Sequence, residues 1–504
     1  MALADYYDRA ALAAAQVIAG FDEDVFRASL ESTHVGIAVG AEAEASHEGQ
    51  VLADLTVRLL ARLYPRLEIG TSDPDGPMRS TLAQLALDIN PQIELVDGAQ
   101  IGIAVGTDAG MFAQTVFAGS QGFDALVSHA SPQSVAASLN PFGAGAAACL
   151  AAAALFRIRF LADGGAANEE GDLVLSTLTG GRAETLAGAS GPWKLDDHAT
   201  LIGLGAIGNA ALWALSRAQI EGTLHLVDHE TIELSNLQRY VLARRADEGV
   251  FKVALAANQP SRLKLVPHEE RFERFVERKK QRLSHALVAL DSAYARRRVQ
   301  ASLPLAVDNA WTQPGDLGVS RHGRFGSSSA CLACLYLPSG AIPNEDQLVA
   351  EALGIADRLM EVRLLLHSGN PVERPLLDAV AEALGIALER LLPFEGRSLW
   401  NLYVEGLCGG AVIPLGQLGQ PRQDVHVPLA HQSALAGVLL AAALVRRIET
   451  AEASTTQVTR VNVLRPVGQD LTQIAAVTGD GRCICEDDDY RAVFEQKWKS
   501  DSST

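Results

Sequence analysis

The stretch that decides the fold runs from residue 200 to residue 252 and reads TLIGLGAIGNAALWALSRAQIEGTLHLVDHETIELSNLQRYVLARRADEGVFK. An apolar strand leads through Gly203, Gly205 and Gly208 into an Ala- and Leu-rich helix, and a second strand delivers Asp228. Glycines at this spacing let backbone N–H groups at a helix N-terminus approach phosphates. In dinucleotide-binding folds, an acid about 20 residues after the last glycine reaches a ribose hydroxyl, and Asp228 lies at this distance from Gly208. The stretch therefore predicts a Rossmann-like nucleotide site.

The residues that follow distinguish a triphosphate from a dinucleotide. A nicotinamide dinucleotide site needs few basic side chains after the acid, yet in this chain Asn236, Arg239 and Lys252 follow it. Asp291 then ends a second apolar strand, ALVALD. Two cations that spread phosphate charge and one strand-end carboxylate that holds Mg²⁺ are typical of an ATP site. Each of these residues alone would be an ordinary surface charge.

Four segments of this region, GLGAIG, VDHETIELSNLQR, GVFK and ALDSAYARR, resemble the adenylating domain of the ThiF/MoeB and ubiquitin-activating-enzyme superfamily. The resemblance spans roughly residues 198–335 and, more loosely, 404–490. It implies an ATP site with Mg²⁺ on Asp291, the ribose on Asp228 and the phosphates along the glycine turn. It also implies nucleotide contacts from a set of polar residues: Glu230, Asn236, Arg239 and Lys252.

The chain departs from the family pattern at three places. Glu230 stands where a second aspartate is usual, Tyr240 stands where a glutamine follows the arginine, and Ser292 replaces an asparagine. Arg296 falls where the family has an arginine after the metal aspartate. The tyrosine leaves the role of its position open.

Composition restricts the class of protein. The chain has 504 residues, a formal net charge of −18 and six cysteines. The negative charge argues against nucleic-acid binding, and the few cysteines argue against a disulfide framework. The most apolar stretches, 143–156 and 434–445, are too short and alanine-rich to span a bilayer, and no signal peptide is recognisable. We expect a cytoplasmic protein without membrane contact.

Alternating strand and helix patterns predict an α/β protein with two Rossmann-like, doubly wound halves. The expected parts, in chain order, are an α/β domain at 1–162, a linker at 163–197, the first part of the adenylation domain at 198–335, a helical insertion at 336–405 and the second part of the adenylation domain at 406–504. Residues 3–30 are expected to form a helix, and the sheet pattern resumes at 404.

Two cysteine pairs lie far apart in the sequence, Cys331 with Cys334 and Cys483 with Cys485. Four thiolates suit a structural Zn²⁺ site without an open coordination position, which would hold the C-terminal segment against the sheet. A disulfide or unrelated buried thiols fit the same spacing. The superfamily resemblance favours zinc.

The remaining two cysteines differ in surroundings. Cys149 lies in AAACLAAAAL and is interpreted as a small buried apolar residue. Cys408 lies in EGLCGGAVIPLG, directly after the helical insertion, where a cysteine can act as a nucleophile. The resemblance to ubiquitin-activating enzymes, whose thioester cysteine lies in an inserted helical region, identifies Cys408 as the candidate catalytic cysteine.

The first 162 residues have α/β character but lack a glycine-rich phosphate-binding turn followed by an acid. They resemble the inactive adenylation-like half of ubiquitin-activating enzymes. In the superfamily an arginine from the opposite half's N-terminal helix reaches the ATP phosphates, and Arg9 is its candidate here. An internal pseudo-dimer in a monomer, or a homodimer, would satisfy this arrangement.

The hypothesis is an ATP-dependent activating enzyme for a ubiquitin-like β-grasp protein, which passes its thioester to a conjugating enzyme. The helical insertion and the fused first half are similar to the activating component of bacterial ubiquitin-like conjugation operons (BilD-type), implicated in anti-phage defence. Two alternatives remain: a ThiF/MoeB-like adenylyltransferase for a sulfur-carrier protein, and a non-catalytic nucleotide-binding scaffold.

Overall fold

The computed structural model describes residues 3–161, 172–181, 191–195, 198–279, 282–313, 315–337, 345–403, 427–450, 455–468 and 471–499. Contacts within the chain separate two compact units. The larger unit comprises Met1–Leu337 with His426–Thr504, and the smaller unit comprises Pro338–Val425.

The N-terminal half of the larger unit is built on a seven-stranded sheet, counted over the described residues, with the strand order β3-β2-β1-β4-β5-β6-β7. Its strands are β1 (His34–Val39), β2 (Arg66–Thr71), β3 (Glu94–Leu95), β4 (Ile101–Val105), β5 (Gln114–Gln121), β6 (Asp124–Ser128) and β7 (Leu173–Ser176). Its helices are α1 (Tyr7–Ala15), α2 (Glu23–Ser32), α3 (Ala41–Ala45), α4 (His47–Leu60), α5 (Pro77–Ile89) and α6 (Phe142–Phe160).

The C-terminal half is built on a second sheet with the strand order β11-β10-β9-β12-β13-β14-β15-β16, and β8 pairs with β10. Its strands are β8 (Trp193–Lys194), β9 (Ala199–Ile202), β10 (Ile220–Asp228), β11 (Leu263–Glu269), β12 (His285–Val288), β13 (Ala306–Gln313), β14 (Asp316–Arg321), β15 (Thr456–Val461) and β16 (Thr472–Ala475). Its helices are α7 (Ala206–Arg217), α8 (Lys252–Ala257), α9 (Phe272–Lys279), α10 (Ala293–Ala301), α15 (Ala430–Glu449) and α16 (Asp488–Lys499).

The two sheets share one topology. In the first sheet the central strand β1 lies between β2 and β4. In the second sheet the central strand β9 lies between β10 and β12 in the same way. The first five strands of each order run parallel, whereas β6 and β7 in one sheet, and β14 and β15 in the other, are antiparallel. This is the doubly wound arrangement expected for both halves, and it places the strand ends β9, β10 and β12 at one edge.

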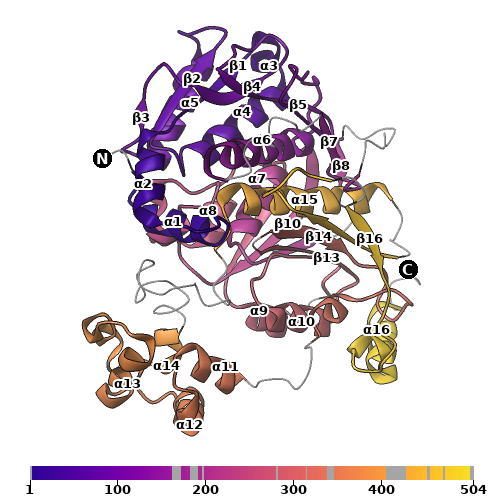
Figure 1. The fold of residues 1–504 in the computed structure, drawn as a ribbon. Coiled ribbons are helices and arrows are strands. Elements are labelled where there is room, and N and C mark those ends of the chain that lie inside the picture. Colours follow the sequence, from indigo (N-terminus) through magenta and orange to yellow (C-terminus); the bar gives the residue numbers. More distant parts are fainter. Residues whose placement is uncertain are drawn as a thin grey trace. The chain divides into compact units, whose positions relative to one another are not determined.

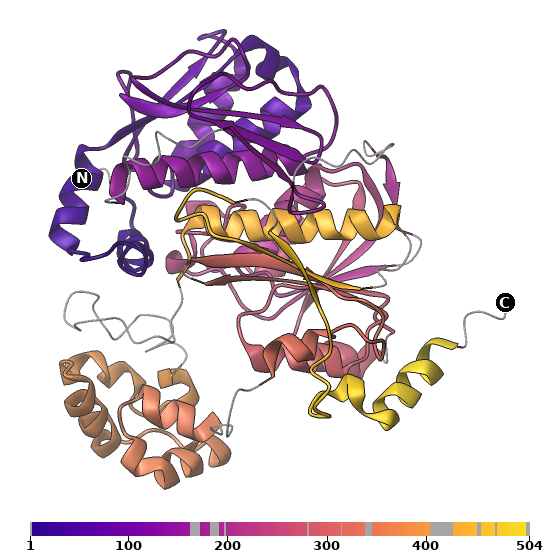
Figure 2. The ribbon, with the colours of Figure 1, turned by 45° about the vertical axis from the view of Figure 1, so that its right-hand side comes forward.

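A layer of helices joins the halves. Helix α6 packs on α4 and on the first sheet, α15 packs on α7 and on the second sheet, and α6 and α15 pack on each other. Figures 1 and 2 show α6 and α15 lying between the two sheets. The buried apolar side chains of both halves form one continuous core through this layer.

Helix α6 is apolar on all sides because it is enclosed on all sides. It is long and apolar enough to cross a membrane by length and composition, with a mean hydropathy of 1.4 over its most apolar stretch, but 89% of that stretch is buried inside the protein. Cys149 on this helix is 1% exposed, which confirms its interpretation as a core residue. A helix without a polar face is typical of a buried core position.

One expected helix was wrong, and the segment expected to be a linker contains two short strands. The helix expected over 3–30 is interrupted, because Gly20 adopts a φ of +67° and Asp22 caps a new helix by accepting from the Val25 N–H at 2.9 Å. The expected linker contains β7, which pairs with β6, and β8, which pairs with β10. Segments this short have too little periodicity to show that they pair with a sheet.

The smaller unit is helical where it is described. It contains α11 (Glu345–Ala352), α12 (Leu359–Ser368), α13 (Arg374–Leu384) and α14 (Leu399–Asn401) around a core of its own. Gly369 and Gly385 end α12 and α13 in the left-handed conformation. The sheet pattern expected to resume at 404 falls on residues outside the described ranges.

Candidate functional site

The glycine turn between β9 and α7 is shaped by close backbone packing. A Cβ on Gly208 would lie 1.9 Å from the Gly203 carbonyl oxygen, and a Cβ on Gly203 would lie 2.6 Å from the Ala289 carbonyl oxygen. Gly205 differs, because the nearest atom to a Cβ there is the Tyr240 hydroxyl at 3.8 Å. Two glycines therefore close the turn and the third leaves room in front of the α7 N-terminus, where unpaired N–H groups favour an anion.

Asp228 lies at the end of β10, next to this turn. Its Oδ2 accepts a hydrogen bond from the Leu204 N–H at 2.7 Å, and its Oδ1 accepts from the Glu230 N–H at 2.9 Å. The structure thus brings the acid and the glycine turn together, which is the geometry that a ribose-binding carboxylate needs.

Lys252 begins α8 and is 4% exposed. Its Nζ lies 2.5 Å from the Glu230 carboxylate. Burial alone would lower the pKa of Lys252, but Tyr240 and the Asp228 and Glu230 carboxylates more than offset burial, and the pKa is raised. The side chain is therefore a fixed positive charge beside the acid of β10, as a phosphate-binding lysine must be.

Arg239 and Lys252 share one aromatic neighbour. The Arg239 guanidinium lies 5.6 Å from the centre of the Tyr240 ring, and the Lys252 ammonium lies 5.2 Å from it. Asn236 is buried and its Oδ1 accepts from the Glu233 N–H at 3.1 Å, so this side chain shapes the short helical turn that precedes the arginine.

Asp291 is exposed just after β12, the strand that pairs with β9. The contact between Gly203 and Ala289 places this strand end beside the glycine turn. An exposed carboxylate oxygen at this edge is a suitable ligand for Mg²⁺. Arg296 is buried on α10 and donates to the Leu290 carbonyl, so it supports the backbone that carries the aspartate.

Arg9 lies half-buried on α1. Its neighbour Ala10 lines a cavity of about 20 Å³ together with Gln238, the residue before Arg239. Helix α1 therefore adjoins the segment that carries Arg239, while the reach of Arg9 to a phosphate stays a prediction.

The corresponding turn of the N-terminal half is occupied by the protein itself. After β1, the Ala41 N–H donates to the Asp108 carboxylate at 3.0 Å, and a Cβ on Gly40 would lie 2.0 Å from that carboxylate. Glu42 and Glu44 add negative charge to the same short helix. An acid at this position repels a phosphate, so this half has no equivalent of the site at α7.

Cys331, Cys334, Cys483 and Cys485 come together, and their Sγ atoms all lie within 4.8 Å of one another. The Sγ atoms of Cys334 and Cys483 lie 3.3 Å apart, and those of Cys331 and Cys334 lie 3.8 Å apart. A tetrahedral zinc ion with Zn–S bonds of about 2.3 Å needs Sγ atoms about 3.8 Å apart. The donor set and its spacing fit zinc with no open coordination position. Cys408 lies outside the described residues.

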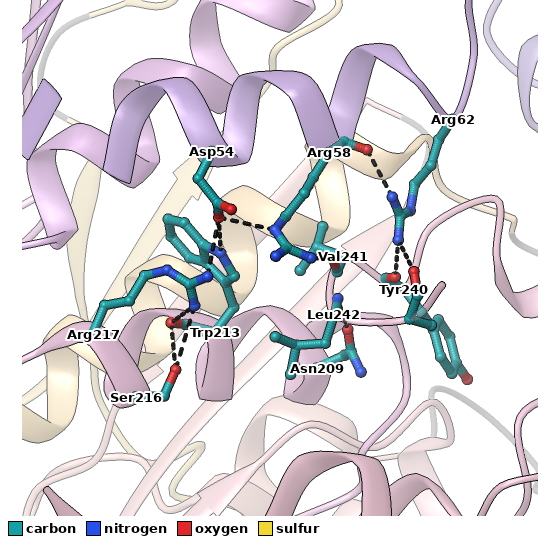
Figure 3. Close-up of polar contacts among 11 residues, drawn as sticks. Asp54, Arg58, Arg62, Asn209, Trp213, Ser216, Arg217, Tyr240, Val241 and Leu242 are labelled. Carbon is teal, nitrogen blue, oxygen red and sulfur yellow. Dashed lines mark hydrogen bonds and ion pairs between the residues drawn. The ribbon is translucent and has the colours of Figure 1, made fainter. Parts of the chain in front are cut away.

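Sequence reasoning missed two site residues, Arg58 and Arg62 of α4. They are 5% and 2% exposed, respectively, and contact the backbone of residues 240–243, which we name the anchored segment. Figure 3 shows both side chains reaching from α4 to this segment. The signal was present as Asp54, Arg58 and Arg62 at every fourth position of an apolar helix, which puts three charges on one buried face.

Two parts of the chain match known protein families, and relatives are found among other proteins. The model of the ThiF family matches residues 188–301, and the model of prokaryotic E2 family C matches residues 38–161. A Sinorhizobium fredii protein described only as uncharacterized protein y4jF is 41% identical over 99% of this chain and 98% of its own length. The catalytic subunit of the Nedd8-activating enzyme E1 of Drosophila melanogaster is 36% identical over 107 residues, which are 20% of this chain and 24% of that subunit.

Among solved structures, Escherichia coli MccB with succinimide is 14% identical over 57% of this chain and 66% of its own chain, with a TM-score of 0.34. Escherichia coli tRNA N6-threonylcarbamoyladenosine dehydratase, TcdA, is 24% identical over 22% of this chain and 51% of its own, with a TM-score of 0.20.

The cysteine cluster makes a prediction about metal content. We expect the purified protein to contain about one zinc ion per chain, and the Cys331→Ser variant to lose it and to unfold at lower temperature, because three thiolates hold zinc less tightly than four. Elemental analysis by mass spectrometry measures this. Cys149→Ser serves as the matched control and should keep its zinc. A wild-type protein without zinc would rule out the site.

Proposed function

Because this chain belongs to the ThiF/MoeB/ubiquitin-activating-enzyme superfamily of adenylyltransferases, we propose that its C-terminal half uses ATP to activate the C-terminal carboxylate of a ubiquitin-like β-grasp protein. The observation that carries the proposal is the convergence of the glycine turn, Asp228, Lys252 and Asp291 at one edge of the second sheet. The similarity to the Nedd8-activating subunit favours a small protein as the substrate.

The chemistry is a substitution at phosphorus. A carboxylate oxygen of the substrate attacks the α-phosphorus of ATP, the bond to the β-phosphate oxygen breaks, and pyrophosphate leaves. A carboxylate is already ionised at neutral pH, so the step needs alignment and charge neutralisation rather than a general base. In the proposal, Lys252, Arg239 and the α7 N-terminus neutralise phosphate charge. Mg²⁺ held by Asp291 would supply further neutralisation when bound.

The second step is proposed for Cys408. Its thiolate attacks the carbonyl carbon of the acyl-adenylate, AMP leaves with the former carboxylate oxygen, and a thioester forms that a conjugating enzyme can accept. The support comes from the sequence, in which the cysteine follows the helical unit. A role in anti-phage defence rests on the same resemblance and is tested by challenging cells that carry or lack the gene with phage; equal survival would contradict it.

The match of residues 38–161 to prokaryotic E2 family C raises a second candidate function, conjugation by the N-terminal half. Cys149 is the cysteine in that range, it is 1% exposed, and burial raises its pKa. A thioester carrier needs an accessible thiolate. The burial therefore favours a supporting role for this half, as an adenylation-like domain without a nucleotide.

Exchange of labelled pyrophosphate into ATP tests the first step. We expect exchange that depends on a cognate β-grasp protein, and a loss of about 100-fold or more in Asp291→Ala, because a metal ligand at the phosphates is removed. Asp24→Ala removes an exposed carboxylate on α2 and is the control. No exchange with any β-grasp protein encoded beside this gene would contradict the proposal. Exchange with a sulfur-carrier protein alone would support the ThiF/MoeB-like alternative.

A gel assay tests the second step. Cys408→Ala should retain pyrophosphate exchange but lose the adduct with the β-grasp protein that thiol reagents release. Cys149→Ala should retain both. An adduct that survives in Cys408→Ala would show that another group is the nucleophile.

A further inference from the structure

The anchored segment follows Arg239 directly, and its carbonyl groups are bound by arginines of the other half. Arg62 donates from Nη2 to the Tyr240 and Ala243 carbonyl oxygens, both at 2.5 Å. Arg58 donates from Nη1 to the Val241 carbonyl oxygen at 2.8 Å. The Tyr240 carbonyl also accepts from the Ala243 N–H at 3.0 Å, whereas the Val241 and Ala243 carbonyls are satisfied from α4.

The same segment is held on its other side by the helix of the glycine turn. The Leu242 N–H donates to Oδ1 of Asn209 on α7 at 2.7 Å. Asn209 is 1% exposed and lies one residue after Gly208. The segment is therefore clamped between the helix that starts at the phosphate turn and a helix of the N-terminal half (Figure 3).

The arginines themselves are held in place. Asp54 on α4 accepts from Arg58 at 2.9 Å, from the Trp213 indole at 2.8 Å and from Arg217 at 3.1 Å. Arg62 also donates to the Arg58 carbonyl at 2.9 Å. Burial lowers the pKa of Arg62 to about 10, so the guanidinium keeps its charge at neutral pH. A buried guanidinium is costly unless it is hydrogen-bonded, which favours this one arrangement.

Tyr240 contacts both Arg62 and the two cations proposed to bind the nucleotide. Its backbone oxygen is bound by Arg62, while its ring faces both the Arg239 guanidinium and the Lys252 ammonium. The ring is 4% exposed, and a cation against a desolvated aromatic face is held more strongly than one in water. Moving the backbone of this residue would move the surface on which both cations rest.

We propose that Tyr240 positions Arg239 and Lys252 for the ATP phosphates, and that Arg62 of the N-terminal half sets the position of Tyr240. This inference rests on the proposed function. It assigns the N-terminal half a part in the site through a residue that touches no nucleotide. It also gives a role to the position at which this chain departs from the family's glutamine.

Direct binding of a fluorescent ATP analogue with Mg²⁺, without any protein substrate, tests the inference. Tyr240→Leu removes the ring and should weaken binding about tenfold, while Tyr240→Phe keeps the ring and should bind like the wild type. Arg62→Met removes the hydrogen bonds to the Tyr240 and Ala243 carbonyls and should weaken binding about as much as Tyr240→Leu does. Arg62→Lys keeps a charge that can reach one carbonyl and should restore part of the affinity.

Arg447→Met is the matched control, because it removes a guanidinium on α15 that binds the backbone carbonyls of Val307 and His322 and the buried Asp308 carboxylate, none of them in the anchored segment. It should lower the unfolding temperature as Arg62→Met does, yet leave the affinity for the analogue unchanged. Equal affinities in wild type, Tyr240→Leu and Arg62→Met would overturn the inference and leave the proposed function standing, as would equal losses in Arg62→Met and Arg447→Met. A wild-type protein that does not bind ATP would overturn both.

Discussion

The nucleotide half depends on two buried arginines that it does not contain. Arg58 and Arg62 extend from α4 of the N-terminal half to carbonyl groups of the anchored segment. Asp54 fixes the direction of Arg58, and Arg62 donates to the Arg58 carbonyl. Without α4, the Val241 and Ala243 carbonyls would lose their arginine partners, and each unpaired buried carbonyl costs about 1–3 kcal/mol. The loop that follows Arg239 is therefore determined by contacts between the halves as well as by its own sequence.

The two halves show how one topology can serve different purposes. Both sheets have the same strand order, and both place a short turn after the central strand. In one half glycines keep the helix N-terminus open, and in the other Asp108 occupies it. The second half is thus suited to bind a phosphate, and the first half supports it through the layer of α4, α6, α7 and α15.

Local patterns predicted the parts of the site that depend on neighbours in sequence. The glycine turn, the acid at the end of β10 and the long helix α15 could be read from the residues themselves. Long-range contacts could be predicted only in part. Cys331 and Cys483 meet across 152 positions. The two cysteine pairs predicted a shared zinc site but left a disulfide or unrelated thiols open, and the resemblance favoured zinc. Arg58 and Arg62 read as surface charges, since only the docking of α4 on the second half buries them.

The central claim is that ATP is cleaved at the α-phosphate by a carboxylate of a β-grasp protein. A substrate labelled with ¹⁸O in its C-terminal carboxylate tests this most directly, with hydroxylamine as the acceptor and mass spectrometry of the products. Transfer of the label into AMP, with pyrophosphate as the other product, is the predicted result. Label in inorganic phosphate with ADP formed, or unlabelled AMP, would contradict the account.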